Sequence, residues 1–123
     1  MIEIRLSWPP RALWQNTRTH WSAEARAKRT AKQEAWALAM PAKGIERPYL
    51  RFAFHPPDNR VRDMQNMPAT QKAAIDGIAK AIGIDDRHFL VSWPIAFSEV
   101  VKGGAVFVTI DEAKNLDLRG VIR

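Results

Sequence analysis

The sequence predicts an α+β domain in which two main helices cover a small mixed β-sheet. Apolar and polar residues alternate in short runs at 2–7, 49–55 and 105–111, which is the pattern of strands with one buried face. Apolar residues recur at helical spacing in 22–40 and 68–82. With one more strand before the last, the expected order is strand, helix, strand, helix, strand, strand.

Length and composition limit the classes of protein that this chain can belong to. The 123 residues suit one compact domain, which we assign to residues 1–111, followed by a polar tail at 112–123 that we expect to be poorly ordered. There is no cysteine, so disulfides and thiolate metal sites are excluded. No apolar run approaches the ~20 residues of a membrane span, and the N-terminus does not resemble a signal peptide. We therefore expect a cytoplasmic protein with no membrane partner.

The charge balance favours a polyanionic partner. Lysine and arginine number 19 against 13 aspartates and glutamates, which gives a net charge of +6. A surplus of this size is compatible with nucleic acid binding and equally with a basic surface that only keeps the protein in solution.

The first strand ends at Pro9-Pro10, since neither proline can donate to a β-ladder. The following stretch, 11–21, has no clean period and predicts a loop in which basic residues alternate with tryptophans. Such a loop could contact phosphates and stack on unpaired bases. The alternative is that the tryptophans cap the core and the basic residues are solvated. The residues concerned are Arg11, Arg18, His20, Trp14 and Trp21.

The first helix is predicted to begin after an N-cap at Ser22 and to end near Met40, before a proline. One face is basic, and it is either a contact with the DNA backbone or a hydrated helix surface. The apolar stripe comprises Ala27, Ala31, Ala35 and Leu38, and the basic face comprises Arg26, Lys28, Arg29 and Lys32.

The second half of the chain is predicted to hold the second helix and a β-hairpin. Pro68 suits a first helical position, and Gly83 suits a left-handed C-terminal cap. Ala74, Ile75, Ile78 and Ile82 form the predicted buried stripe of that helix. The β-rich run at 88–101 and the strand at 105–111 flank a Lys-Gly-Gly turn, which favours a hairpin.

Three acidic residues flank the second helix and are candidates for metal chemistry. They are Asp63, Asp85 and Asp86. Carboxylates that hold Mg²⁺ can activate water and neutralise charge on phosphoryl oxygens, and Mg²⁺ prefers oxygen ligands. Lys72 could stabilise the developing charge. The alternative is that Asp85 and Asp86 form a polar turn and that Asp63 pairs with Arg60 or Arg62.

Several motifs, in order and at similar spacing along nearly the whole chain, resemble those of RusA-type Holliday-junction resolvases. They are LSWPP, THWSAE, PPDNRVRDMQN, QKAAIDGI, IDD and KGG. The resemblance implies an α+β fold, a homodimer and Mg²⁺-dependent paired nicking of four-way DNA junctions. It also implies a role in DNA recombination and repair, phage or prophage origin, and Mn²⁺ as a possible substitute metal.

The resemblance also implies roles for particular residues. The first aspartate of the family's D-x-D-N motif falls on Asp63, and the catalytic aspartate after the helix falls on Asp86, beside Asp85. The family's functional lysine most resembles Lys72, although residues 68–70 are inserted before it. The family's second aspartate is replaced by Gln65, whose side chain can offer a carbonyl oxygen to a metal but carries no charge.

We therefore expect Asp63, Asp86 and Lys72 to be catalytic and the metal to be held by Asp63, Asp86, Asp85 and Gln65. A straight helix over 68–82 holds its ends ~22 Å apart, so a twofold dimer with antiparallel second helices would bring Asp63 of one chain near Asp86 of the other. One alternative is a junction-binding protein that no longer cuts. A weaker one is a general single-strand or RNA-binding module. The expected DNA-binding residues are Arg18, His20, Arg26, Arg29, Arg60, Arg62 and Lys72.

Overall fold

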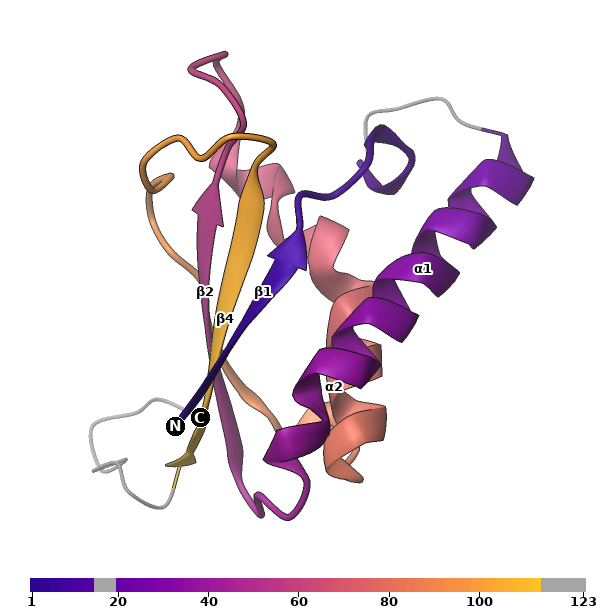
Figure 1. Ribbon diagram of the computed structural model, residues 1–123, viewed down its shortest axis with the longest axis vertical. Coiled ribbons are helices and arrows are strands. Elements are labelled where there is room, and N and C mark those ends of the chain that lie inside the picture. The colour runs from indigo at the N-terminus through magenta and orange to yellow at the C-terminus, as the bar shows by residue number, and fades with distance from the viewer. Residues whose placement is uncertain (15–19, 114–123) are drawn as a thin grey trace.

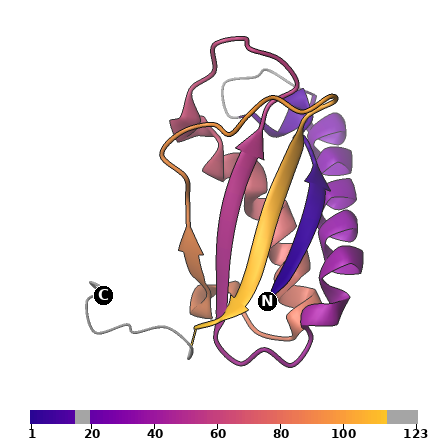
Figure 2. The same cartoon turned by 60° about the vertical axis from the view of Figure 1, so that its left-hand side comes forward.

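A computed structural model of the protein describes residues 1–14 and 20–113 and confirms the α+β class. Two helices, α1 (Trp21–Ala39) and α2 (Lys72–Ile82), cover the same face of a four-stranded sheet (Figure 1). In the part of the chain that the structure describes, the opposite face of the sheet carries no helix (Figure 2). The strands are β1 (Ile2–Ser7), β2 (Pro48–His55), β3 (Leu90–Ser92) and β4 (Ala105–Glu112).

The sheet is mixed, with the strand order β1-β4-β2-β3. β4 runs antiparallel to both β1 and β2, so that Val108 lies opposite Ile4 on one side and Phe52 on the other. These three side chains are buried, as are Phe54 and Ile110. The alternating sequence pattern therefore predicted the buried face of all three long strands correctly.

The predicted hairpin across the Lys-Gly-Gly turn is wrong. Gly104 N–H does close a turn on the Val101 carbonyl at 2.8 Å, with Gly103 and Gly104 both at positive φ. The preceding strand, β3, pairs in parallel with β2 instead, on the side away from β4. Pro94 cannot donate to a ladder, and β3 ends before it. The chain beyond it still runs beside the end of β2, where Ser98 N–H donates to the Phe54 carbonyl at 2.9 Å and Val101 N–H donates to the Pro56 carbonyl at 3.0 Å.

Helix α1 differs from its prediction at the N-cap and on its apolar stripe. The N-cap is His20, whose Nδ1 accepts a hydrogen bond from the Ser22 backbone N–H at 3.2 Å, so Ser22 lies inside the helix. Leu38 is 42% exposed, whereas Ala39 is buried beside Ala35. The buried stripe thus continues in steps of four residues, and Leu38 falls just outside it.

Helix α2 is preceded by a 3₁₀ turn, η4 (Pro68–Gln71), so the α-helix proper begins only at Lys72. Gly83 ends it in the left-handed conformation with φ 87°, as predicted, and donates to the Ala79 carbonyl at 2.8 Å. Gly77 lies against the backbone of α1, where an added Cβ would collide with the Lys32 carbonyl oxygen. The absence of a side chain at Gly77 therefore sets the close approach of the two helices.

The segment after β1 contains a short 3₁₀ turn, η1 (Arg11–Leu13), where the sequence indicated only a loop. Trp14 packs on Trp8 with ring centroids 6.3 Å apart, and its Nε1 donates to the Pro9 carbonyl, which confirms that this tryptophan caps the core. Trp21, however, is 74% exposed and does not. Among the residues that the structure describes, no helix is long and apolar enough to cross a membrane.

Candidate functional site

A groove lies between the first half of α1 and the start of α2. It encloses about 610 Å³, and its floor includes Ala12, Leu13 and Thr70. The residues on its sides are mostly basic and come from both helices, because Gly77 lets the helices approach closely. The charged residues that line it are Lys28, Arg29, Lys32, Lys72, Glu24 and Asp76.

The groove has a surplus of positive charge that is free to meet a ligand. Lys28 Nζ lies 2.9 Å from Glu24 Oε1, one turn away on the same helix. Arg29, Lys32 and Lys72 make no ion pair with any residue in the part of the chain that the structure describes. Unpaired cations of this kind can contact the phosphates of a nucleic acid backbone. We call this feature the basic groove.

The loop between β2 and the acidic motif is held rigidly by Arg62. One Arg62 Nη donates to Asp58 Oδ1 at 2.8 Å, and the other donates to the Asp58 and Arg60 carbonyls at 3.0 Å each. The Arg62 side chain is only 13% exposed, and its guanidinium lies 5.6 Å from the centre of the Trp8 ring. The backbone N–H of Arg60 and the Arg62 guanidinium lower the pKa of Asp58.

The tip of the same loop is free. Arg60 is 80% exposed at its side chain, and Val61 is 98% exposed. The loop projects beyond the end of the sheet, at the top of Figure 1. Arg62 therefore fixes the base of the loop, while Arg60 is available to a partner.

Asp63 caps a short 3₁₀ turn, η3 (Met64–Asn66), which lies just before η4. Its Oδ1 accepts a hydrogen bond from the Gln65 backbone N–H at 2.9 Å. Both side chains are exposed, and Gln65 makes no side-chain hydrogen bond with the described residues. The pairing of Asp63 with Arg60 or Arg62 is not formed, because both arginines bind Asp58. Asp63 thus keeps its second oxygen available.

Asp86, which follows α2, lies near two other carboxylates, those of Asp85 beside it in sequence and of Asp76 on the second turn of α2. Asp85 caps the 3₁₀ turn η5 (Asp86–His88) by accepting from the Arg87 backbone N–H at 3.0 Å, and this bond lowers the pKa of Asp85. Loss of hydration raises the pKa of Asp86, and the neighbouring Asp85 and Asp76 carboxylates raise it further. A carboxylate among other carboxylates is electrostatically suited to receive a cation.

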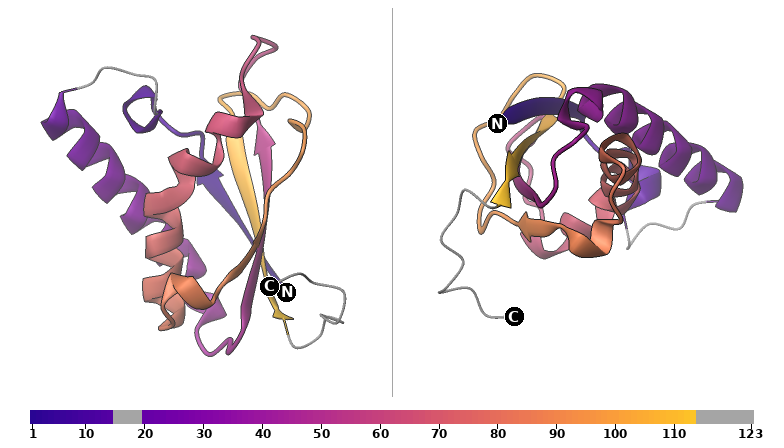
Figure 3. Two further views of the ribbon diagram at one scale, coloured as in Figure 1. Left: turned by 180° about the vertical axis from the view of Figure 1, so that it is seen from behind. Right: turned by 90° about the horizontal axis from the view of Figure 1, so that it is seen from below.

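Asp63 precedes η4 and Asp86 follows α2, and the segments on either side of these helices lie at opposite ends of α2 (Figures 1 and 3). The four 3₁₀ residues and eleven α-helical residues between them span about 24 Å, at ~2.0 Å and ~1.5 Å per residue. Within residues 1–14 and 20–113, no three His, Cys, Asp or Glu side chains are grouped so as to hold a metal ion. The carboxylates of a single described chain therefore do not form the expected metal site.

The predicted DNA-binding residues lie in different environments, and that of Arg60 and Arg62 is the loop after β2 described above. Arg29 and Lys72 line the basic groove, and Arg26 lies on the neighbouring turn of α1. Nδ1 of His20 is engaged at the N-cap, and its ring lies 5.6 Å from that of Trp21. Arg18 lies outside the described residues.

Sequence reasoning gave too little weight to several residues at this site. Lys28 and Lys32 were only part of a broad basic face, and the sequence could not show that this face meets α2. In the sequence, Lys72, Asp76 and Lys80 recur every four residues, a spacing that favours ion pairs along α2. Instead, Lys80 Nζ lies 5.1 Å from the centre of the Trp36 ring, and Asp76 faces the acidic end.

Comparison with known proteins gives a consistent result. No family model matches the chain. The chain is 38% identical over 118 residues to the crossover junction endodeoxyribonuclease RusA of Escherichia coli K12, covering 91% of this chain and 95% of that protein. It is 36% identical, with the same coverage, to the crossover junction endodeoxyribonuclease of Enterobacteria phage 82. It is also 39% identical over 117 residues to an uncharacterized protein of Xylella fastidiosa, of which it covers 76%.

These identities extend over nearly the full length of both the bacterial and the phage enzymes. They agree with the order of motifs from the first strand to the glycine turn and with the mixed sheet covered by two helices. The chain belongs to the RusA family of crossover junction endodeoxyribonucleases.

Proposed function

We propose that this protein is a Mg²⁺-dependent endonuclease that resolves four-way (Holliday) DNA junctions by paired nicks, in DNA recombination and repair. The observation that carries the proposal is the near full-length similarity to crossover junction endodeoxyribonucleases. The phage relative supports a phage or prophage origin.

The basic groove supports the DNA-binding part of the proposal. Arg29, Lys32 and Lys72 lie together without ion-pair partners among the described residues, and Arg60 projects from the loop before Asp63. These cations neutralise backbone phosphates, and each neutralised phosphate releases counterions. Binding therefore weakens steeply as salt is added.

The separation of the acidic clusters supports a site shared between two chains. In a twofold dimer with antiparallel α2 helices, Asp63 of one protomer lies near Asp86 and Asp85 of its partner, with Gln65 beside them as a neutral ligand. Bound Mg²⁺ supplies an activated water and charge neutralisation at the phosphoryl group, with Mn²⁺ as a substitute. Two such sites in a dimer match the two strands that must be cut.

Lys72 stands where it can assist the reaction. It is the first residue of α2, it is exposed, and it lines the basic groove on the same side as Asp76. Its ammonium group holds a non-bridging oxygen of the scissile phosphate and stabilises the charge that develops there. We expect its replacement by methionine to lower the nicking rate more than it lowers junction affinity.

A nicking assay tests the proposal. Purified protein is incubated with end-labelled four-way junction and Mg²⁺ or Mn²⁺, beside the variants Asp63→Asn and Gln65→Asp. We expect paired nicks from the wild type, their loss in Asp63→Asn, and at least about tenfold faster nicking in Gln65→Asp, because a second negative charge strengthens metal binding. Nicks that persist in Asp63→Asn would contradict the assigned role of this residue.

Gln65 supports a second candidate function, a junction-binding protein that does not cut. Because this side chain is neutral, the metal site has one charge fewer than the family pattern. The same assay distinguishes the two functions. Tight junction binding without nicks, with nicks restored in Gln65→Asp, would favour the binding protein.

A further inference from the structure

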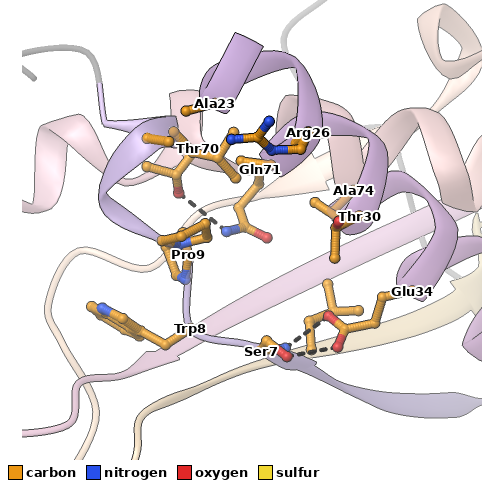
Figure 4. A pocket seen from close by; sticks show the side chains of 16 residues that line it. Ser7, Trp8, Pro9, Ala23, Arg26, Thr30, Glu34, Thr70, Gln71 and Ala74 are labelled. Atoms are coloured by element: carbon orange, nitrogen blue, oxygen red, sulfur yellow. Dashed lines mark hydrogen bonds between the residues drawn. The ribbon is translucent and has the colours of Figure 1, made fainter. Parts of the chain in front are cut away.

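A second cavity, separate from the acidic residues, lies between the end of β1 and the inner side of α1 (Figure 4). Its volume is about 460 Å³. Its walls are mainly apolar and come from β1, η1, the segment between them, α1 and α2; they include Leu6, Pro9, Leu13, Ala27, Ala31 and Ala74. On one side of the cavity, Glu34 links α1 to β1, because its carboxylate accepts hydrogen bonds from Ser7 N at 2.9 Å and Ser7 Oγ at 2.6 Å.

One side chain, that of Gln71, presents a polar atom to this cavity. Gln71 is 3% exposed, and its Nε2 donates to Thr70 Oγ1 at 3.1 Å. Thr70 Oγ1 donates its only proton to the Met67 carbonyl oxygen at 2.6 Å, so toward Gln71 Nε2 it can act only as an acceptor. This fixes the orientation of the amide, and Gln71 Oε1 faces the interior of the cavity (Figure 4). Its oxygen makes no hydrogen bond with the described residues.

An amide oxygen that opens onto an apolar cavity favours a ligand with an N–H or O–H donor, because a ligand that fills the cavity without such a donor leaves this acceptor unpaired. The surrounding walls favour a flat apolar body around that donor. The cavity also adjoins the basic groove, since Ala12, Leu13 and Thr70 line both. Arg26 lies at its exposed edge. A ligand that enters here can therefore keep an attached phosphate among the cations of the groove.

We propose that this cavity, the Gln71 pocket, accepts an unpaired nucleobase of the bound DNA, whose N–H donates to Gln71 Oε1. The inference rests on the proposed binding of branched DNA, where bases at the crossover can leave the stack. The walls replace the lost stacking, and the amide oxygen replaces a lost base-pairing contact. The pocket thereby contributes to the choice of the DNA position that the protein holds.

The test compares two four-way junctions in EDTA, so that cleavage plays no part. Each carries one unpaired nucleotide at the crossover, either a cytidine or an abasic tetrahydrofuran analogue. We expect the wild type to bind the cytidine junction roughly tenfold more tightly by fluorescence anisotropy, which is the scale of one base stack. Gln71→Met and Thr30→Phe should each reduce this preference to less than about twofold, with abasic binding unchanged.

Two controls accompany these variants. Thr30 lies on the exposed rim of the pocket, so Thr30→Phe blocks the entrance without altering the core, and Thr30→Ser should retain the preference. Lys32→Gln should weaken binding to both junctions by the same factor, because it removes a phosphate contact only. Thermal unfolding verifies that each variant is folded.

Each outcome bears on a different claim. Equal wild-type affinity for the two junctions overturns the base pocket while leaving the junction-cutting function in place. A preference that survives in both Gln71→Met and Thr30→Phe also overturns the pocket. Failure to bind either junction contradicts the proposed function itself, and the pocket with it.

Discussion

Arg62 shows how the environment of one side chain separates a structural arginine from a binding one. It makes three hydrogen bonds to Asp58 and Arg60 and is 13% exposed, whereas Arg60 is 80% exposed, two residues away. The sequence places both in the same basic loop. Only the fold reveals that Trp8 lies beneath Arg62 and that Asp58 binds both arginines.

We therefore expect Arg62→Ala to destabilise the protein by about 1–3 kcal/mol, the scale of hydrogen bonds to a charged group. The matched variant Arg60→Ala should change stability by less than about 0.5 kcal/mol, as exposed substitutions usually do. Urea unfolding measures both. Equal stability of the two variants would contradict the structural role assigned to Arg62.

The candidate site could be predicted in part at this scale. Asp63, Asp86 and Lys72 were identified because they stand in motifs that resemble those of the family. The function of Gln71 could not be anticipated, since its importance depends on Thr70 donating to the Met67 carbonyl. Likewise, the raised pKa of Asp86 requires the proximity of Asp76, which stands on α2 and precedes Asp86 by ten residues in sequence.

At the scale of elements, Gly77 controls how α1 and α2 meet. Helix propensity alone predicts that Gly77→Ala stabilises the protein by about 1 kcal/mol. The structure predicts the opposite sign, because the new Cβ would overlap the Lys32 carbonyl oxygen and press on Trp36 N and Ala35 Cβ. We expect a net loss of about 1–3 kcal/mol, the usual cost of overpacking.

Gly83→Ala is the comparison variant, because nothing lies within 4 Å of its added Cβ and its cost comes only from positive φ. Amide NMR shifts of Trp36 should move in Gly77→Ala and remain in place in Gly83→Ala. A more stable Gly77→Ala protein with unmoved α1 shifts would contradict the close helix contact. Loosening this contact should also widen the basic groove and weaken DNA binding.

The apolar and polar pattern of the sequence predicted the long strands and helices well. It predicted the strand pairing and the helix cap less well. Alternation identified β1, β2 and β4 and their buried faces, because every second residue of a one-sided sheet must be apolar. The hairpin was wrong because strand pairing depends on which neighbour is available, and β2 offers β3 a parallel edge. The N-cap of α1 was misplaced by two residues, since an imidazole nitrogen can accept from the helix as a serine oxygen does.

At the scale of the whole molecule, the acidic residues suggest an assembly larger than one chain. The clusters at Asp63 and Asp86 are separated by the full length of η4 and α2, and the described part of one chain contains no metal-binding group of three. A twofold arrangement removes this separation and supplies two sites for two strands. We therefore propose that each site takes Asp63 from one protomer and Asp86 from its partner.

Subunit mixing tests this claim most directly. Asp63→Asn and Asp86→Asn proteins, each inactive alone, are unfolded together, refolded, and assayed on a labelled four-way junction. Shared sites predict that the mixture regains about one quarter of the wild-type sites, and that its nicks are single, because half of the dimers are mixed and each has one intact site. Wild type mixed with the double variant should form no active mixed dimers. An inactive mixture of the single variants, with active dimers of wild type and double variant, would contradict the shared site.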